Sequence, residues 1–122
     1  MPEGGNLPSA GTSRARSLQE SPTTRLARFF SEASPVRIPV QLTRLGTDET
    51  SENTVIEYGT PREILFASKL SLQFADMLRV QNSDRSLDVE ASVVALQYNG
   101  DRTAVAARFT RDVPNWILKS GS

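Results

Sequence analysis

The chain has 122 residues with 14 basic and 14 acidic side chains, which leaves room for one domain and provides no global basic field for nucleic acid. It contains no cysteine and no histidine, so disulfides, thiolate zinc ligands and the commonest general base are excluded, which argues against an enzyme. No apolar run approaches the roughly 20 residues of a membrane span. The N-terminus lacks the basic and apolar regions of a signal peptide, so we expect a cytoplasmic protein.

The first part of the chain is predicted to be a tail with one helical segment. Residues 1–22 are rich in Pro, Gly, Ser and Thr, which predicts disorder because such a segment buries too little surface to offset its ordering entropy. From Thr23 to Ala33 the pattern changes. Leu26, Phe29 and Phe30 share the i, i+3, i+4 spacing of one helical face.

This helix, capped by Thr23 or Thr24, is too short to be stable alone. We expect it to dock on the core of the domain. The alternative is a basic amphipathic segment, carrying Arg25 and Arg28, that binds a partner or a membrane surface. Residues 1–35 are therefore assigned to a disordered or partly helical N-terminal tail.

From Val36 onward the pattern is that of β-strands. Val36, Ile38, Val40 and Leu42 alternate with polar residues, as in a half-buried strand. Pro39 cannot donate a ladder hydrogen bond, so part of this strand is expected at an edge.

Polar segments separate the strands that follow. Residues 45–53 predict a solvated acidic loop, which lacks the glycine and terminal Glu of a calcium-binding EF-hand, so no metal site is expected. Residues 59–62 predict a turn, and residues 68–75 are expected to plug one end of a barrel. The strands predicted around these segments span residues 54–58, 63–67 and 76–81.

The strongest local signal is a hairpin between Leu87 and Phe109. Its turn contains Asn99-Gly100, which indicates a type I′ turn with positive φ at both residues. After Val93 the apolar phase of the outgoing strand flips, as a β-bulge produces. The apolar set after the flip is Val94, Leu96 and Tyr98. One face of the returning strand is expected to hold Val105, Ala107 and Phe109.

Near the end, Asp112 can cap a short helix that holds Pro114 and Trp116, with the tryptophan packed against the barrel. Roughly six short strands with regularly spaced turns and no long helix predict an all-β protein. We expect a small six-stranded β-barrel over residues 36–118, with a short C-terminal helix and a C-terminal tail at residues 119–122.

The second half of this pattern resembles PilZ domains, and the resemblance covers about residues 36–118. It implies a six-stranded barrel of bacterial cyclic di-GMP signalling that binds this dinucleotide through two motifs. One is Arg-x-x-x-Arg before the first strand, and the other is Asp/Asn-x-Ser-x-x-Gly on the next strands. The resembling segments are Leu78-Arg79-Val80, Val93-Val94, Asn99-Gly100, Val105-Ala106-Ala107-Arg108-Phe109 and Pro114-Asn115-Trp116.

The arginine motif is incomplete. Arg37 stands where the resemblance places the second arginine, but the first position is Ala33. Arg25 and Arg28 lie further upstream, and their spacing is one residue too short. Arginine matters here because its guanidinium binds phosphate bidentately and stacks on guanine.

The second motif is also incomplete. The acid survives as Glu57, while Gly59 replaces the serine and Arg62 replaces the glycine. An arginine at that last position occupies ligand space unless it turns toward a phosphate. One interpretation is therefore that Arg37, Glu57 and Arg62 are exposed charges on strands and turns and bind no ligand.

The resemblance predicts a regulatory or binding module that has lost the standard nucleotide site and contacts a protein partner. The alternative is a non-standard cyclic di-GMP receptor. In that receptor Arg25 or Arg28 folds over the barrel and joins Arg37 and Arg62 at the phosphates.

Two further function classes fit less well. An enzyme without histidine or cysteine needs paired carboxylates or an activated lysine, and neither Lys69 nor Lys119 has an evident base beside it. Single-strand nucleic-acid binding needs exposed aromatics beside a basic groove, for which only Tyr58 or Tyr98 qualifies. We expect no catalytic residue, no cofactor and no nucleic-acid partner.

Overall fold

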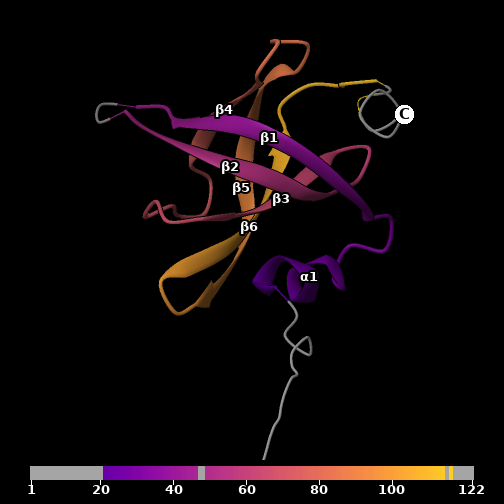
Figure 1. Ribbon diagram of the computed structural model, residues 1–122, viewed down its shortest axis with the longest axis vertical. Helices are drawn as coiled ribbons and strands as arrows, with labels where there is room; N and C mark the ends of the chain where they lie inside the picture. Colours follow the sequence, from indigo (N-terminus) through magenta and orange to yellow (C-terminus); the bar gives the residue numbers. More distant parts are fainter. Residues whose placement is uncertain (1–20, 47–48, 115, 117–122) are drawn as a thin grey trace, which may run out of the picture.

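The computed structural model describes residues 21–46, 49–114 and 116, and within them antiparallel strands close into a barrel with the order β1-β2-β3-β6-β5-β4 (Figure 1). The predicted six-stranded all-β barrel is thus confirmed. The helix α1 lies against its outside. The elements are α1 (Pro22–Ala27), β1 (Ser34–Arg44), β2 (Thr50–Gly59), β3 (Glu63–Ser68), β4 (Met77–Asn82), β5 (Asp88–Asn99) and β6 (Arg102–Phe109).

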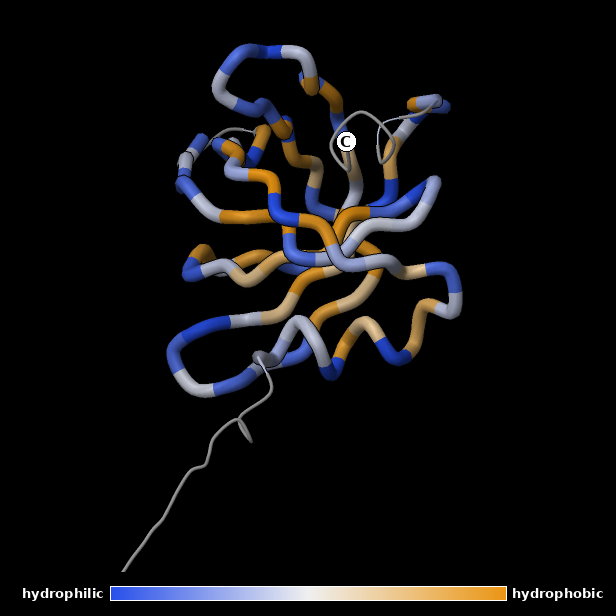
Figure 2. Tube along the Cα trace, turned by 45° about the vertical axis from the view of Figure 1, so that its right-hand side comes forward, coloured by the Kyte–Doolittle hydropathy of each residue, from blue (hydrophilic) through white to orange (hydrophobic). Residues whose placement is uncertain are grey.

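The barrel interior follows the alternation of the sequence. Figure 2 shows hydrophobic residues along the strands and hydrophilic residues at the turns. On β6, Val105, Ala107 and Phe109 join the interior core, as expected. Between β3 and β4, Leu72 is buried in the same core and Leu70 packs against it, whereas Phe74 is exposed, so the predicted plug is only partly formed. The largest fully buried interior side chains are Leu42, Ile56, Ile64, Phe66, Leu78, Val80, Val93 and Val105.

The β5–β6 hairpin confirms the bulge and corrects the turn. The register shifts between Val93 and Ala95, where the apolar phase flips. Asn99 pairs with Arg102, so the two-residue loop is Gly100-Asp101 rather than Asn99-Gly100. Only Gly100 has a positive φ in this turn, +64°, which matches type II′ rather than the predicted type I′.

The phase flip is only partly as predicted. Leu96 packs against the interior core, but Val94 belongs to the bulge and packs on the outer side of the barrel. Tyr98 is exposed, because the tip of the hairpin carries the side chain away from the packed core.

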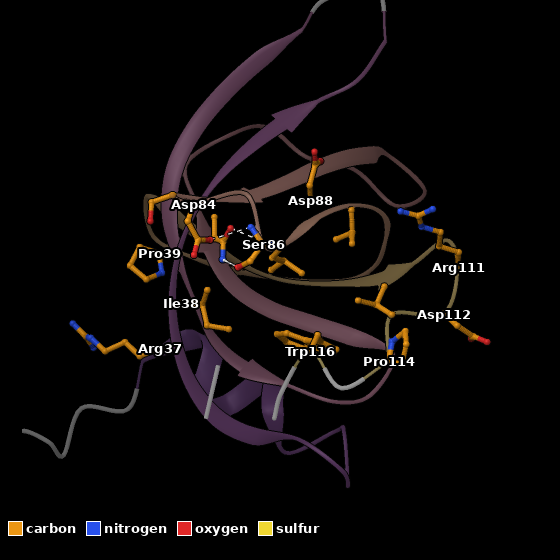
Figure 3. A pocket seen from close by; sticks show the side chains of 15 residues that line it. Arg37, Ile38, Pro39, Asp84, Ser86, Asp88, Arg111, Asp112, Pro114 and Trp116 are labelled. Carbon is orange, nitrogen blue, oxygen red and sulfur yellow. Dashed lines mark hydrogen bonds between the residues drawn. The ribbon is translucent and has the colours of Figure 1, made fainter. Parts of the chain in front are cut away.

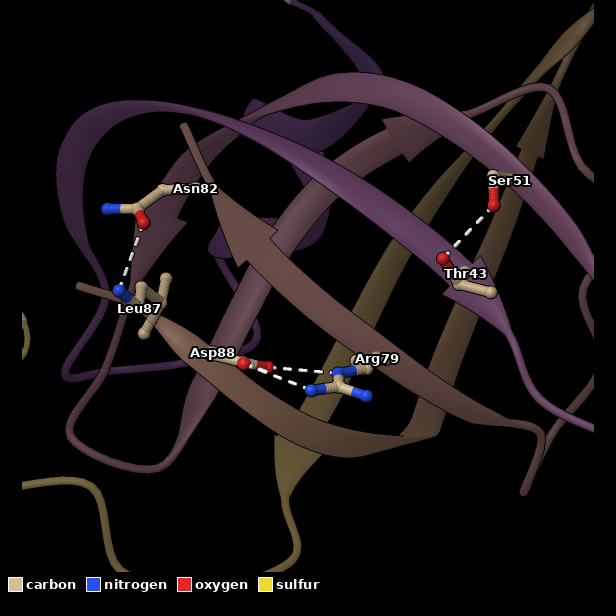
Figure 4. A network of polar contacts seen from close by, with 6 residues as sticks. All are labelled: Thr43, Ser51, Arg79, Asn82, Leu87 and Asp88. Atoms are coloured by element: carbon tan, nitrogen blue, oxygen red, sulfur yellow. Dashed lines mark hydrogen bonds and ion pairs between the residues drawn. The ribbon is translucent and has the colours of Figure 1, made fainter. Parts of the chain in front are cut away.

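Strand β2 begins at Thr50, inside the predicted acidic loop, so that part of the prediction is wrong. Polar cross-strand contacts extend the strand: Thr43 and Ser51 share a hydroxyl hydrogen bond of 3.0 Å (Figure 4). The Glu52 carboxylate accepts hydrogen bonds from the Ser68 hydroxyl and the Lys69 amide. These bonds stabilise an exposed pair of strands without apolar alternation.

The N-terminal helix docks on the barrel as expected, but it is shorter than predicted. Ser21 caps it, because the Ser21 hydroxyl accepts a hydrogen bond from the Thr24 amide. After Ala27 the chain forms i→i−3 turns, so the predicted helical face is not kept. Leu26 is 5% exposed whereas Phe29 is 78% exposed.

Several predictions lie outside the described residues. These are the disorder of residues 1–20 and most of the C-terminal helix and tail. The domain boundary at residue 36 stays a prediction. Trp116 is buried against the interior core, as expected. None of the helices in the described part of the chain has the length and apolar character needed to cross a membrane.

Candidate functional site

The structure divides the predicted site residues among three places. Arg25 lies on α1, and Arg28 is its C-cap. Arg37 and Glu57 lie on adjacent strands at a bulge, since the β1–β2 register shifts between Pro35 and Ile38. The last two residues, Gly59 and Arg62, lie at the β2–β3 turn.

Glu57 is engaged with the N-terminal helix. Its carboxylate accepts a hydrogen bond of 3.1 Å from the Ser21 hydroxyl, and the neighbouring Tyr58 hydroxyl lies 3.0 Å from Thr24 Oγ1. Glu57, which the resemblance would place against a nucleotide, therefore binds Ser21, the N-cap residue of α1.

Gly59 packs against Trp116. A Cβ built on Gly59 would lie 2.4 Å from Cη2 and 2.6 Å from Cζ2 of this ring, which is closer than any side chain tolerates. The ring is fixed by a 3.0 Å hydrogen bond from Nε1 to the Thr60 carbonyl and by an edge-to-face contact with Phe109 at 5.4 Å. The absence of a side chain at Gly59 thus lets the Trp116 ring pack closely against the backbone at this end of the barrel.

A polar network that the sequence analysis missed holds the β2–β3 turn. The Thr60 hydroxyl accepts a hydrogen bond from the Glu63 amide and donates one to the Glu63 carboxylate. The nearly buried Glu63 also pairs with Arg108, with 2.8 Å between Oε2 and Nη2. A Thr hydroxyl that accepts from amides two and three residues on is a common turn device, and Thr60 was visible in the sequence.

Arg62 follows in the same turn with an exposed side chain. Its amide donates to the Thr60 hydroxyl, and its carbonyl accepts from the Phe109 amide. The backbone of Arg62 is therefore fixed while its guanidinium extends from the barrel, and no described residue pairs with that guanidinium.

Trp116 also lines a cleft of about 640 Å³. It forms because β1 pairs with β4 only from Val40 onward, so the first half of β1 has one side without a strand. Trp116, Ile38 and Leu87 line its apolar part. Arg37 and Arg111 lie on opposite sides, with Arg37 pointing away from Trp116 (Figure 3).

The wall formed by the β4–β5 turn and the start of β5 carries two hydrogen-bonded carboxylates, Asp84 and Asp88. A hydrogen bond from the Ser86 amide lowers the pKa of Asp84. Hydrogen bonds from Arg79, both 3.0 Å long, lower the pKa of Asp88 and raise that of Arg79 (Figure 4). The cleft therefore combines two arginines with acids that stay ionised at neutral pH.

This arrangement does not assemble the predicted site. Arg37 lines the cleft, but Arg25, Arg28, Glu57, Gly59 and Arg62 do not. Among the described residues, no three carboxylate side chains converge as metal ligands do. The ligand role of these six residues stays a prediction.

No protein-family model and no curated protein matches the chain. Among solved structures, it is similar to the inhibitor of motility MotI/DgrA of Bacillus subtilis, with a TM-score of 0.53 and 13% identity over 72% of this chain. The chain spans only 45% of that protein. At this identity the likeness shows the fold alone.

Proposed function

We propose that this chain is a non-catalytic PilZ-like regulatory module of bacterial cyclic di-GMP-type signalling in the cytoplasm. In this proposal it has lost the standard nucleotide site and acts through contacts with a protein partner. The similar solved structure is by its title an inhibitor of motility, a regulatory role, which supports the class of function.

The observation that carries the proposal is the contact between Gly59 and Trp116. A side chain at position 59 would point into the packed barrel end rather than toward a ligand, because the Trp116 ring occupies the Cβ direction. Glu57, the surviving acid of the motif, is hydrogen-bonded to Ser21. Atoms of the chain itself thus fill or engage the positions from which the motif would contact a nucleotide.

Calorimetric titration of the full chain with cyclic di-GMP tests the loss of the site. We expect no heat beyond that of a GMP control and no shift in melting temperature at saturating nucleotide. Binding with 1:1 stoichiometry and micromolar affinity would contradict the proposal.

A second candidate, the non-standard cyclic di-GMP receptor, is favoured by one observation. The exposed Arg37 and Arg111 flank a cleft of a size typical of small-molecule sites, and in the described part of the chain neither guanidinium has an ion-pair partner. If the titration shows binding, Arg37→Ala should abolish it under this second proposal. Arg102→Ala, which removes an exposed arginine at the hairpin tip, is the matched control and should leave binding unchanged.

A further inference from the structure

One face of the barrel is buried without belonging to its interior. All six positions of β3 are buried, although only alternate residues of a strand can face inward. On β6 the outward Ala104 and Ala106 are fully buried too. These two alanines and Leu65 of β3 form the outer face of the barrel, and Leu26 of α1 packs on it.

The outer face is shaped for a helix. Two alanines beside one larger side chain present little bulk, and the single leucine of α1 packs on them. Hydrogen-bonding groups lie at its edge, where Glu57 and Tyr58 contact Ser21 and Thr24. A short amphipathic helix with one leucine and flanking hydroxyl groups makes both the apolar and the hydrogen-bonding contacts of this surface. Binding of an amphipathic helix by its apolar face is a common mode of peptide recognition.

The helix that occupies the surface is short and, within the described residues, buries an unpaired polar group. It has six residues, below the length at which a helix is stable alone. Thr23 is fully buried in the docked state, yet in the described structure its hydroxyl has no hydrogen-bond partner. An unpaired buried hydroxyl opposes docking, because that group regains water when the helix leaves.

Release of the helix leaves the barrel ladder intact. Strand pairing begins at Ser34 with Gly59, and a six-residue segment, 28–33, separates this pair from the end of α1. Each strand-pairing contact therefore survives undocking.

We propose that α1 is a removable cover over a partner-binding site, and that the outer face of β3 and β6 accepts a short amphipathic helix of a partner protein in its place. This inference rests on the proposed function and deepens it, since it names the surface and the class of partner. It depends on Leu65, Ala104 and Ala106 rather than on any nucleotide-binding residue.

A free peptide tests whether α1 is a removable cover. The peptide carries residues 21–33 of this chain and is titrated into the full-length protein and into full-length Leu26→Asp, in which the cis helix is released. A tethered segment has an effective concentration on the order of millimolar, so the titration extends into that range and amide NMR shifts report binding.

We expect the peptide to shift amides of Leu65, Ala104 and Ala106 in Leu26→Asp. Its affinity for the wild type should be weaker by on the order of tenfold, because the cis helix occupies the site. The control peptide, which itself carries Leu26→Asp, should bind neither protein.

Three results would overturn the inference. They are equal binding to both proteins, no binding to Leu26→Asp while its barrel amides remain protected from exchange, or loss of the barrel in this variant and in the milder Leu26→Ala. The last result would make α1 an integral part of the core. Binding of cyclic di-GMP would instead refute the proposed function without changing the peptide result.

Discussion

The two faces of β6 are both buried, but different neighbours bury them. Val105, Ala107 and Phe109 face a core closed by strands on every side. Ala104 and Ala106 are covered by α1 and by side chains beside it, including Phe30. The inner face cannot open without breaking the barrel. Under our proposal the outer face opens when α1, a six-residue helix, leaves. Equal burial therefore corresponds to unequal local stability.

The largest loss of stability is expected from a substitution in the barrel interior. Phe109→Ala should reduce the free energy of unfolding by roughly 3–5 kcal/mol, because it leaves a cavity against Trp116. Urea denaturation followed by circular dichroism measures this change. Phe74→Ala, at a side chain that is 71% exposed, is the control and should change stability by no more than about 0.5 kcal/mol. A loss well under 1 kcal/mol for Phe109→Ala would mean that the strand faces are reversed.

Gly59→Ala probes the packed barrel end. The added methyl group overlaps the Trp116 ring, so we expect a loss of about 1–3 kcal/mol and a shift in the emission of this single tryptophan. Replacing the ring by Trp116→Leu should make the Gly59→Ala change smaller, which a double-mutant cycle detects as non-additivity. Additive losses would mean that the two residues do not contact.

A matched pair of leucines compares the two faces directly. Leu42→Ala, in the interior, should cost about 2–5 kcal/mol. Leu26→Ala should cost only roughly 1–2 kcal/mol, because undocking of α1 limits the loss to the free energy of docking. Chemical denaturation of both variants gives the two values, and equal losses would contradict the distinction between the faces.

The smallest effect is expected at the exposed ion pair between Arg79 and Asp88. Its guanidinium lowers the Asp88 pKa below the ordinary value of 3.8, so the pair stabilises the fold above that pH and the contribution disappears as pH falls through the lowered pKa. The difference in melting temperature between wild type and Asp88→Asn should shrink on acidification below pH 3.8 and in high salt. A difference that grows on acidification would contradict the sign of the pKa shift.

The interior was predictable from sequence because alternation is a local property. The inward residues of β6 and the bulge after Val93 follow from side-chain order alone. The start of β2 was missed because hydroxyl contacts such as Thr43 to Ser51 replace apolar alternation there. Burial of Ala104 and Ala106 on the second face depends on a helix distant in sequence.

The candidate site was less predictable for the same reason. The hydrogen bond of Glu57 comes from Ser21, 36 residues earlier, and Trp116 bonds to Thr60, 56 residues before it. A motif comparison assigns Glu57 and Gly59 to a ligand because it cannot see these partners. The Thr60 turn, by contrast, is local, because its hydroxyl bonds the amides of Arg62 and Glu63, and it could have been recognised.

Amide hydrogen exchange of the full chain, with and without saturating cyclic di-GMP, tests the central claim most directly. We expect α1 to exchange faster than the interior ladder in both samples, and we expect the nucleotide to protect no amide near Arg37, Glu57 or Gly59. Protection of the β1–β2 bulge by the nucleotide, together with slow exchange of α1, would contradict both the loss of the nucleotide site and the removable cover.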